Sequence, residues 1–126
     1  MREITYLASP YTHVSEVVMQ ERYERVRKFV YLALKRDVVY FSPIIYYHPM
    51  AREYKMEVDF SVFAQANFAF LGRMENMEVL LLPGWKQSDG IRQELKRAQL
   101  LNLSVIYVTI LEETEDTQNV RYSIRP

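Results

Sequence analysis

Two polar residues and a glycine in the second half of the chain can bind an anion. Ser88, Asp89 and Gly90 directly precede a stretch with helical periodicity. Ser or Asp at a helix N-cap accepts hydrogen bonds from free backbone N–H groups, and Gly lets a ligand approach closely. The exposed amides and the helix dipole attract negative charge, so a phosphate or carboxylate group fits here. The same residues also suit an ordinary capped helix.

Glu94 lies one turn into this predicted helix and can place a carboxylate beside the anion. Ile91, Leu95 and Ala98 form the face expected to pack on a sheet. Glu94 adjoins that face and points toward the helix N-terminus, so it can reach a ligand crevice. The positive end of the helix would help the carboxylate to stay ionised. The alternative is a surface ion pair with Arg97, three residues further on.

Two aromatic residues are further candidates, and several familiar motifs are missing. Tyr6, on the first predicted strand, can hydrogen-bond a catalytic carboxylate or pack in the core. Trp85, in a loop after a strand, can stack on a base or cover the sheet edge. His13 and His48 lack metal-ligand spacing, and the Walker A, Gly-x-Gly-x-x-Gly and Gly-x-Ser-x-Gly patterns are absent from the sequence. We therefore expect no metal and no cofactor.

The elements that must position these residues alternate along the chain. Strands are predicted at 3–8, 38–41, 78–82 and 104–110, helices at about 15–36, 58–74 and 91–101, and loops at 44–54 and 83–90. This order implies parallel strands joined by right-handed crossovers. The expected fold is an α/β/α three-layer sandwich, flavodoxin-like or Rossmann-like, with four or five parallel strands. Ligands bind such sheets where the strand order reverses, here between the first and third strands.

Composition bounds the class of protein. The 126 residues predict one domain, 1–126. The 16 basic and 16 acidic residues balance, so we expect no nucleic acid polymer as partner. The chain has no cysteine, which excludes disulfides, thiolate metal sites and a Cys nucleophile. No apolar run approaches the ~20 residues of a membrane span, and no signal peptide is visible. We therefore expect a cytoplasmic protein with no membrane partner.

Two segments together carry a family resemblance. The chain opens with Tyr-Leu-Ala-Ser-Pro-Tyr at 6–11, and Leu-Pro-Gly-Trp-Lys-Gln-Ser-Asp-Gly at 82–90 is followed by Glu94 and Ala98. Ser-Pro-Ile at 42–44 and His-Pro at 48–49 fit the same pattern. These residues resemble the nucleoside 2-deoxyribosyltransferase superfamily, above all its small members. The chain is also similar to the 2'-deoxynucleoside 5'-monophosphate N-glycosidases, and the resemblance spans about residues 4–108.

The resemblance implies cleavage of the N-glycosidic bond of a (deoxy)nucleoside 5'-monophosphate, by hydrolysis or by transfer of the base. The nucleophilic Glu of the family falls on Glu94, which would attack the anomeric carbon and form a glycosyl ester. The strand-one Tyr falls on Tyr6, which would orient Glu94. Ser88 matches the phosphate-contacting Ser of the monophosphate hydrolases and favours a nucleotide substrate. The other expected substrate-binding residues are Ser9, Tyr11, Trp85, Asp89 and Gly90.

One catalytic position departs from the family pattern. The general-acid Asp falls on Asn67, if Glu75 is the acidic residue before the third strand. An amide can hydrogen-bond a base but cannot donate a proton as a carboxylic acid does, and losing such help costs ~10²–10⁴-fold in rate. Asp59, two turns earlier, substitutes only in a different helix register. The alternatives are therefore an enzyme, a non-catalytic nucleotide-binding or sensing protein, and an unrelated α/β protein whose motifs are structural.

Members of this family are commonly dimers or higher oligomers whose sites borrow residues from a neighbour. The resemblance therefore implies a homodimer or higher homo-oligomer. The aromatic loop 44–54, the second predicted helix and the C-terminal tail are the expected interface, and aromatic residues are enriched at such surfaces.

Overall fold

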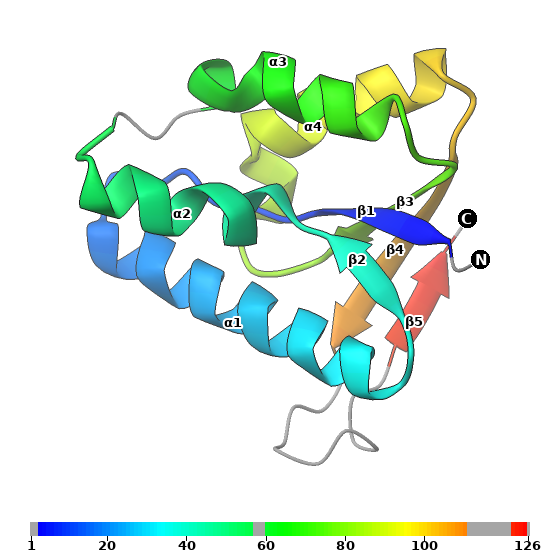
Figure 1. Ribbon diagram of the computed structural model, residues 1–126, viewed down its shortest axis with the longest axis horizontal. Helices are drawn as coiled ribbons and strands as arrows, with labels where there is room; N and C mark the ends of the chain where they lie inside the picture. Colours follow the sequence, from blue (N-terminus) through cyan, green and yellow to red (C-terminus); the bar gives the residue numbers. More distant parts are fainter. Residues whose placement is uncertain (1–2, 57–59, 111–121, 126) are drawn as a thin grey trace.

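The computed structural model describes residues 3–56, 60–110 and 122–125 (Figure 1). The elements follow the order β1 (Ile4–Ala8), α1 (Glu16–Lys35), β2 (Val39–Phe41), α2 (Pro43–Glu53), α3 (Phe60–Leu71), β3 (Asn76–Leu80), α4 (Asp89–Leu100), β4 (Ser104–Ile110) and β5 (Tyr122–Arg125). A short 3-10 turn, Trp85–Gln87, lies between β3 and α4. None of the helices in these residues is long and apolar enough to cross a membrane.

The sheet confirms the predicted fold class and the predicted position of the crevice. Its strand order is β2-β1-β3-β4-β5, and the first four strands are parallel. β1 and β3 are direct neighbours, so the strand order reverses between them as expected. β5 differs from the predicted parallel pattern because it pairs antiparallel with β4 at the edge of the sheet.

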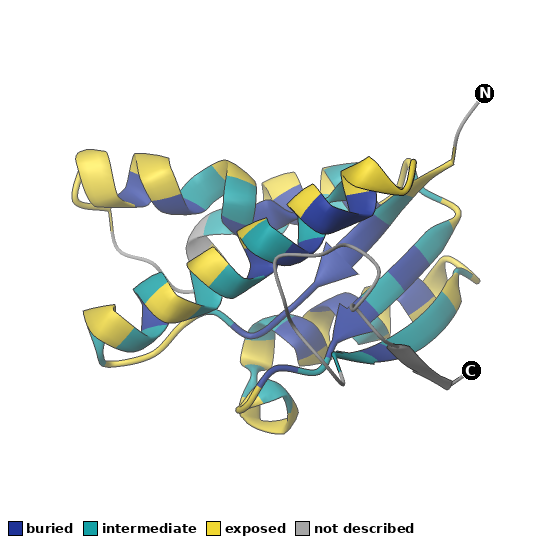
Figure 2. Ribbon diagram, turned by 90° about the horizontal axis from the view of Figure 1, so that it is seen from below, coloured by how far each residue is buried: buried dark blue, intermediate teal, exposed yellow. Residues whose placement is uncertain are grey.

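Alternation along β1 divides the core into two layers. Leu7 packs with Val26 and Phe29 of α1 on one face of the sheet. Tyr6 and Ala8 point to the other face and belong to the cluster that includes residues of α3 and α4. Figure 1 shows α1 and α2 on one side of the sheet and α3 and α4 on the other, and Figure 2 shows the buried residues concentrated along the strands and the inner faces of the helices. The three-layer α/β/α architecture is therefore present.

Helix α2 corrects the prediction of a loop over 44–54. Ser42 caps the helix by accepting a hydrogen bond from the Ile45 N–H, and Pro43 occupies the first turn, where a missing N–H costs nothing. Ile44, His48 and Ala51 are buried on one side, at helical spacing. Pro49 inside the helix concealed this pattern, because proline normally interrupts a helix interior.

The other boundaries shift by a few residues. β3 ends at Leu80, two residues before the predicted end, and α4 begins two residues earlier than predicted because Ser88 is its N-cap. The described part of α3 runs from Phe60 to Leu71. The predicted beginning of that helix at 58, and Asp59, lie outside the described residues.

Candidate active site

A cavity of about 620 Å³ lies at the C-terminal ends of the parallel strands. Its walls come from the loop after β1, the first turns of α2, one side of α3, and the loop and first turns of α4. This is the crevice that topology predicts for a doubly wound sheet. Its size is within the range of cavities that hold a small organic ligand.

Glu94 and Tyr6 meet beside this cavity. Both side chains are almost inaccessible, with 4% of Glu94 and 0% of Tyr6 exposed. The Tyr6 hydroxyl donates a hydrogen bond to Oε2 of Glu94. Tyr6 comes from β1 and Glu94 from α4, 88 positions apart, so the fold brings together the pair that the sequence singles out. Glu94 lines the cavity, whereas Tyr6 reaches it only through Glu94.

Burial shifts the ionisation of both groups. Burial raises the pKa of Glu94 to about 8, and the hydrogen bond from Tyr6 acts in the opposite direction. The pKa of Tyr6 is raised well above its ordinary value, first by burial and then by Glu94. In the described part of the chain no Lys or Arg forms an ion pair with Glu94, and Arg97 lies over the ring of Phe68 instead. Burial therefore favours the protonated form of Glu94 near pH 7, in contrast to the ionised form expected from the helix dipole.

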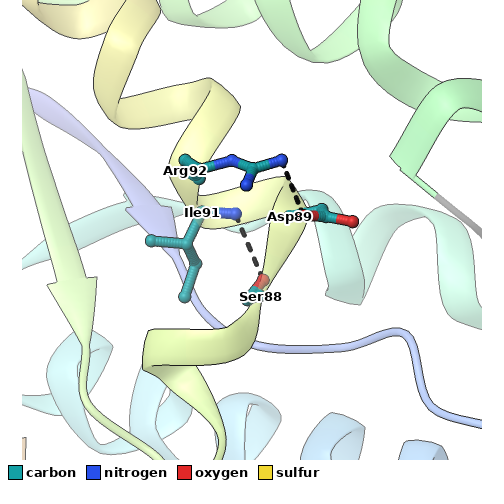
Figure 3. A network of polar contacts seen from close by, with 4 residues as sticks. All are labelled: Ser88, Asp89, Ile91 and Arg92. Atoms are coloured by element: carbon teal, nitrogen blue, oxygen red, sulfur yellow. Dashed lines mark hydrogen bonds and ion pairs between the residues drawn. The ribbon is translucent and has the colours of Figure 1, made fainter.

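The start of α4 forms the outer wall of the cavity. The Ser88 hydroxyl accepts a hydrogen bond from the Ile91 N–H at 3.2 Å, and Asp89 forms an ion pair with Arg92 at 2.8 Å (Figure 3). Ser88, Asp89, Gly90 and Arg92 all line the cavity. The N–H groups in the first turn have no acceptor within the helix, so this end can bind an anion. The predicted anion-binding residues thus lie in the same cavity as Glu94.

Two buried polar atoms in the cavity wall have no hydrogen-bond partner among the described residues. They are Oγ of Ser9 and Oδ1 of Asn67. Both residues line the cavity, with 7% of Ser9 and 4% of Asn67 exposed. A buried unpaired polar group costs about 1–3 kcal/mol, so such atoms are normally satisfied by water or a ligand.

A chain of hydrogen bonds that the sequence did not reveal leads from the cavity to the surface of α1. The Tyr11 hydroxyl lies 2.5 Å from Nδ1 of His48, and Nε2 of His48 lies 2.7 Å from Oε1 of Gln20. Nε2 of Gln20 donates to Glu24 at 3.2 Å. The ring of Tyr23 stacks on His48 with centroids 4.2 Å apart. The only sequence signal was the His-Pro pair at 48–49, to which no role was assigned.

The direction of this chain follows from the chemistry of its members. The Gln20 amide donates to Glu24, so its oxygen faces His48 and can only accept. His48 therefore carries its proton on Nε2, and Tyr11 donates to the free Nδ1. Burial lowers the pKa of His48, and the Arg52 cation lowers it further while Glu24 raises it. The neutral ring that this pattern needs is thus the favoured form.

Arg22 is a second residue that sequence reasoning missed. Its guanidinium donates to the backbone carbonyls of Tyr11 and Thr12 at 3.1 and 3.2 Å, and to that of Pro83 at 3.3 Å. It therefore ties the loop after β1 to the loop after β3. Gly84 has φ 91°, and a Cβ at this position would lie 2.4 Å from Nη2 of Arg22. Glycine leaves the space in which the guanidinium lies.

Trp85 lies outside the cavity lining. Its ring centroid is 5.9 Å from that of Tyr107 on β4, and it packs against the core cluster on this face of the sheet. Of its two predicted roles, the geometry fits the covering of the sheet rather than the stacking of a ligand. Among the described residues no three histidine, aspartate or glutamate side chains gather closely enough to hold a metal ion.

The fold and the site together define a flavodoxin-like α/β protein with a buried carboxyl group at the strand switch point. Residues 3–110 match the family model described as a domain of unknown function, DUF1937. The chain belongs to this family. No curated protein matches it.

Proposed function

We propose that the protein cleaves the N-glycosidic bond of a (deoxy)nucleoside 5'-monophosphate, with Glu94 as the nucleophile. The pairing of Glu94 with Tyr6 beside a ligand-sized cavity carries this proposal. The resemblance of segments 6–11 and 82–90 to the nucleoside 2-deoxyribosyltransferase superfamily supports it. The reaction makes the protein a hydrolase or a transferase of nucleotide metabolism, and a cytoplasmic location agrees with such a substrate.

In the proposed reaction one carboxylate oxygen of Glu94 attacks C1' of the sugar. The C1'–N bond breaks, its electron pair stays with the base, and a glycosyl ester forms on Glu94. Water, or the nitrogen of a second base, then attacks C1' and releases the carboxylate. Tyr6 binds Oε2 of Glu94, which leaves Oε1 for the attack. Glu94 must lose its proton first, because only the carboxylate is nucleophilic.

The 5'-phosphate would bind at the start of α4. The N–H groups at the start of the first turn lie at this end together with Ser88, whose hydroxyl oxygen already accepts from the Ile91 N–H, and the guanidinium of Arg92 adds a positive charge. Arg92 forms an ion pair with Asp89 and is largely exposed, so it can turn to a phosphate at small cost. The unpaired hydroxyl of Ser9, in the loop after β1, is a further donor in the cavity lining.

A non-catalytic nucleotide-binding or sensing protein is the second candidate. Asn67 favours it, because an amide stands where the related enzymes carry a general acid. The raised pKa of Glu94 also favours it, since a protonated carboxyl group can donate a hydrogen bond to a ligand without attacking it. In this case the cavity would bind the nucleotide and leave the glycosidic bond intact.

A base-release assay separates the two candidates. The protein is incubated with a panel of ribo- and deoxyribonucleoside 5'-monophosphates, and free base is measured by chromatography. Under the first proposal base is released, and Glu94→Gln abolishes the release while keeping nucleotide binding by calorimetry. Glu21→Gln on the exposed side of α1 is the matched control. Binding without release by the unaltered protein would support the second candidate, and release by Glu94→Gln would refute the role of Glu94.

We also propose a homo-oligomer. Tyr46, Met50 and Tyr54 on or just after α2 expose 51%, 38% and 70% of their surface, which is much apolar area for one short segment. Light scattering coupled to size-exclusion chromatography measures the assembly, and Tyr46→Glu should dissociate it. A monomeric unaltered protein at micromolar concentration would contradict this proposal.

A further inference from the structure

The inner wall of the cavity, formed by Glu94, Asn67 and Tyr11, offers hydrogen-bond acceptors. Asn67 presents an amide oxygen without a partner among the described residues. Tyr11 lines the cavity and gives its own proton to His48, so its oxygen can still accept a hydrogen bond. Glu94 supplies a carboxyl group with no cation paired to it in the described part of the chain. A ligand group that fits this wall donates hydrogen bonds, carries positive charge, or does both.

Aromatic rings flank the inner wall. Tyr47 and Phe63 line the cavity and stack on each other, with ring centroids 4.3 Å apart and planes inclined by 19°. Phe68 lines it as well, with the Arg97 guanidinium already 4.3 Å from its ring centroid. Aromatic faces attract cations and flat heterocycles, so these rings and the acceptors point to the same kind of ligand. The one cation in the described lining, Arg92, lies on the outer wall and is paired with Asp89.

Apart from Glu94, the proposed nucleophile, the described lining lacks a group suited to protonate a departing base. Asn67 is neutral and cannot act as an acid. Asp89 is exposed and bound to Arg92. Burial raises the pKa of Tyr11 to about 12, and its proton already lies in the hydrogen bond to His48. A neutral heterocycle would therefore have to leave as an anion, whereas a cationic one leaves as a neutral molecule and needs no acid.

We propose that the substrate's leaving group is a positively charged heterocycle, a pyridinium or an N7-alkylated purine, attached through its cationic ring system to a sugar 5'-phosphate. This inference rests on the proposed N-glycosidase function. When Glu94 attacks C1', the electron pair of the C1'–N bond neutralises the heterocycle. Water then hydrolyses the ester, giving the sugar 5'-phosphate, the Glu94 carboxylate and one proton released to solvent.

The charge of such a substrate also activates the nucleophile. Burial favours the protonated form of Glu94, because no positive charge among the described residues compensates the carboxylate. A cationic ring placed against Glu94 supplies that charge and lowers its pKa, so binding itself would produce the attacking carboxylate. A neutral base offers no such compensation. A positively charged substrate thus explains why Glu94 has no cationic partner among the described residues and why position 67 carries an amide instead of an acid.

Matched nucleotide pairs that differ in charge test the inference. One pair is 7-methylguanosine 5'-monophosphate and guanosine 5'-monophosphate, in ribo and deoxyribo forms. The other is nicotinamide mononucleotide and its neutral 1,4-dihydro form. Base release is measured at pH 7.5, and the rate of spontaneous hydrolysis is subtracted. The enzymatic rate is then divided by the spontaneous rate, so that differences in the intrinsic lability of the glycosidic bonds cancel. Calorimetry in two buffers of different ionisation enthalpy measures proton release on binding, with Glu94→Gln as control.

We expect the corrected kcat/KM of at least one cationic member to exceed that of its partner about 10²-fold or more, the usual value of acid assistance. Binding of that member should release protons from the unaltered protein and none from Glu94→Gln. Asn67→Asp should reduce the ratio of the two corrected kcat/KM values, because it raises the rate of base release from the neutral nucleotide. Equal corrected rates of base release from both members of a pair would overturn the inference, but the proposed N-glycosidase function would be retained. If no nucleotide is bound and none releases its base, both the inference and the proposed N-glycosidase function are wrong.

Discussion

The Tyr11 hydroxyl lies 2.5 Å from Nδ1 of His48, and this contact connects the wall of the cavity to the surface of α1. From His48 the hydrogen bonds continue through Gln20 to Glu24, and every donor points away from the cavity. The ring stacked by Tyr23 is buried and neutral. Tyr11, which lines the cavity, is therefore held in place by His48, a residue that does not line it.

Replacing His48 with Gln should make stability less sensitive to acid. Burial lowers the folded-state pKa of His48 below its ordinary value of 6.5, so the stability that the neutral ring contributes is present above pH 6.5 and lost as the pH falls below it. The free energy of unfolding of the unaltered protein, measured with urea, should therefore fall more between pH 7 and pH 5 than that of His48→Gln. His13→Gln, at an exposed position, is the control. Parallel pH dependences in all three proteins would contradict the assignment.

Replacing Tyr6 with Phe should impair Glu94 without unfolding the protein. The change removes the one hydrogen bond that the structure gives the Glu94 carboxyl group, worth about 1.5–3 kcal/mol for a charged partner. Base release should fall about 10- to 100-fold. Its pH profile should shift upward, because this hydrogen bond lowers the pKa of Glu94.

Tyr40→Phe is the matched control for that change. Tyr40 donates a comparable hydrogen bond to Glu78 at 2.5 Å, and neither residue lines the cavity. Tyr40→Phe should alter the free energy of unfolding and leave base release per folded molecule unchanged. A similar loss of activity in Tyr6→Phe and Tyr40→Phe would show that the loss comes from a general disturbance of the sheet and not from the lost hydrogen bond to Glu94.

Replacing Glu94 with Gln should stabilise the protein at alkaline pH. The folded-state pKa of Glu94, about 8, lies above the ordinary 4.5, so the protonated group favours folding and this contribution is lost as the pH rises toward 8. Ionisation of the buried carboxyl group costs at most about 5 kcal/mol. The difference in free energy of unfolding between Glu94→Gln and the unaltered protein should therefore grow from pH 5 to pH 9. A constant difference over this range would mean that Glu94 is not buried in solution.

Replacing Gly84 with Ala should loosen the connection between the two loops. The added Cβ would displace the Arg22 guanidinium, and φ 91° is unfavourable for Ala, so we expect a destabilisation of about 1 kcal/mol or more. Arg22→Ala should destabilise on its own by freeing three carbonyl groups. The double variant should cost less than the sum, because the displaced side chain is then absent. Strict additivity in urea unfolding would show that the two residues do not interact.

Much of the site follows from the sequence because topology and local capping signals act together. The alternation of strands and helices placed the crevice between β1 and β3, and Ser88 followed by Asp89 and Gly90 marked the start of α4. Glu94 adjoins the buried face of that helix, and its pairing with Tyr6 was expected from the family resemblance. These features depend on short-range patterns and on a general rule of sheet connection.

The parts that could not be predicted depend on long-range packing. Pro49 contradicts local helix propensity, yet α2 forms because Ile44, His48 and Ala51 are buried against the rest of the molecule. With α2 taken as a loop, nothing indicated that His48 would approach Tyr11. The guanidinium of Arg22 donates to the backbone carbonyls of Tyr11 and Pro83, 11 and 61 positions away in the sequence. Hydrophobic periodicity gives no information about such contacts. Side chains that bridge loops leave no local signal.

The two edge strands of the sheet, β2 and β5, are both short. β2 has three residues and β5 has four, and β5 occupies the pairing groups of β4 that would otherwise be open. A brief edge gives another polypeptide few backbone groups on which to extend the ladder. Copies of this molecule are thus poorly suited to joining strand to strand into a continuous sheet, which lowers the risk of fibre-like growth.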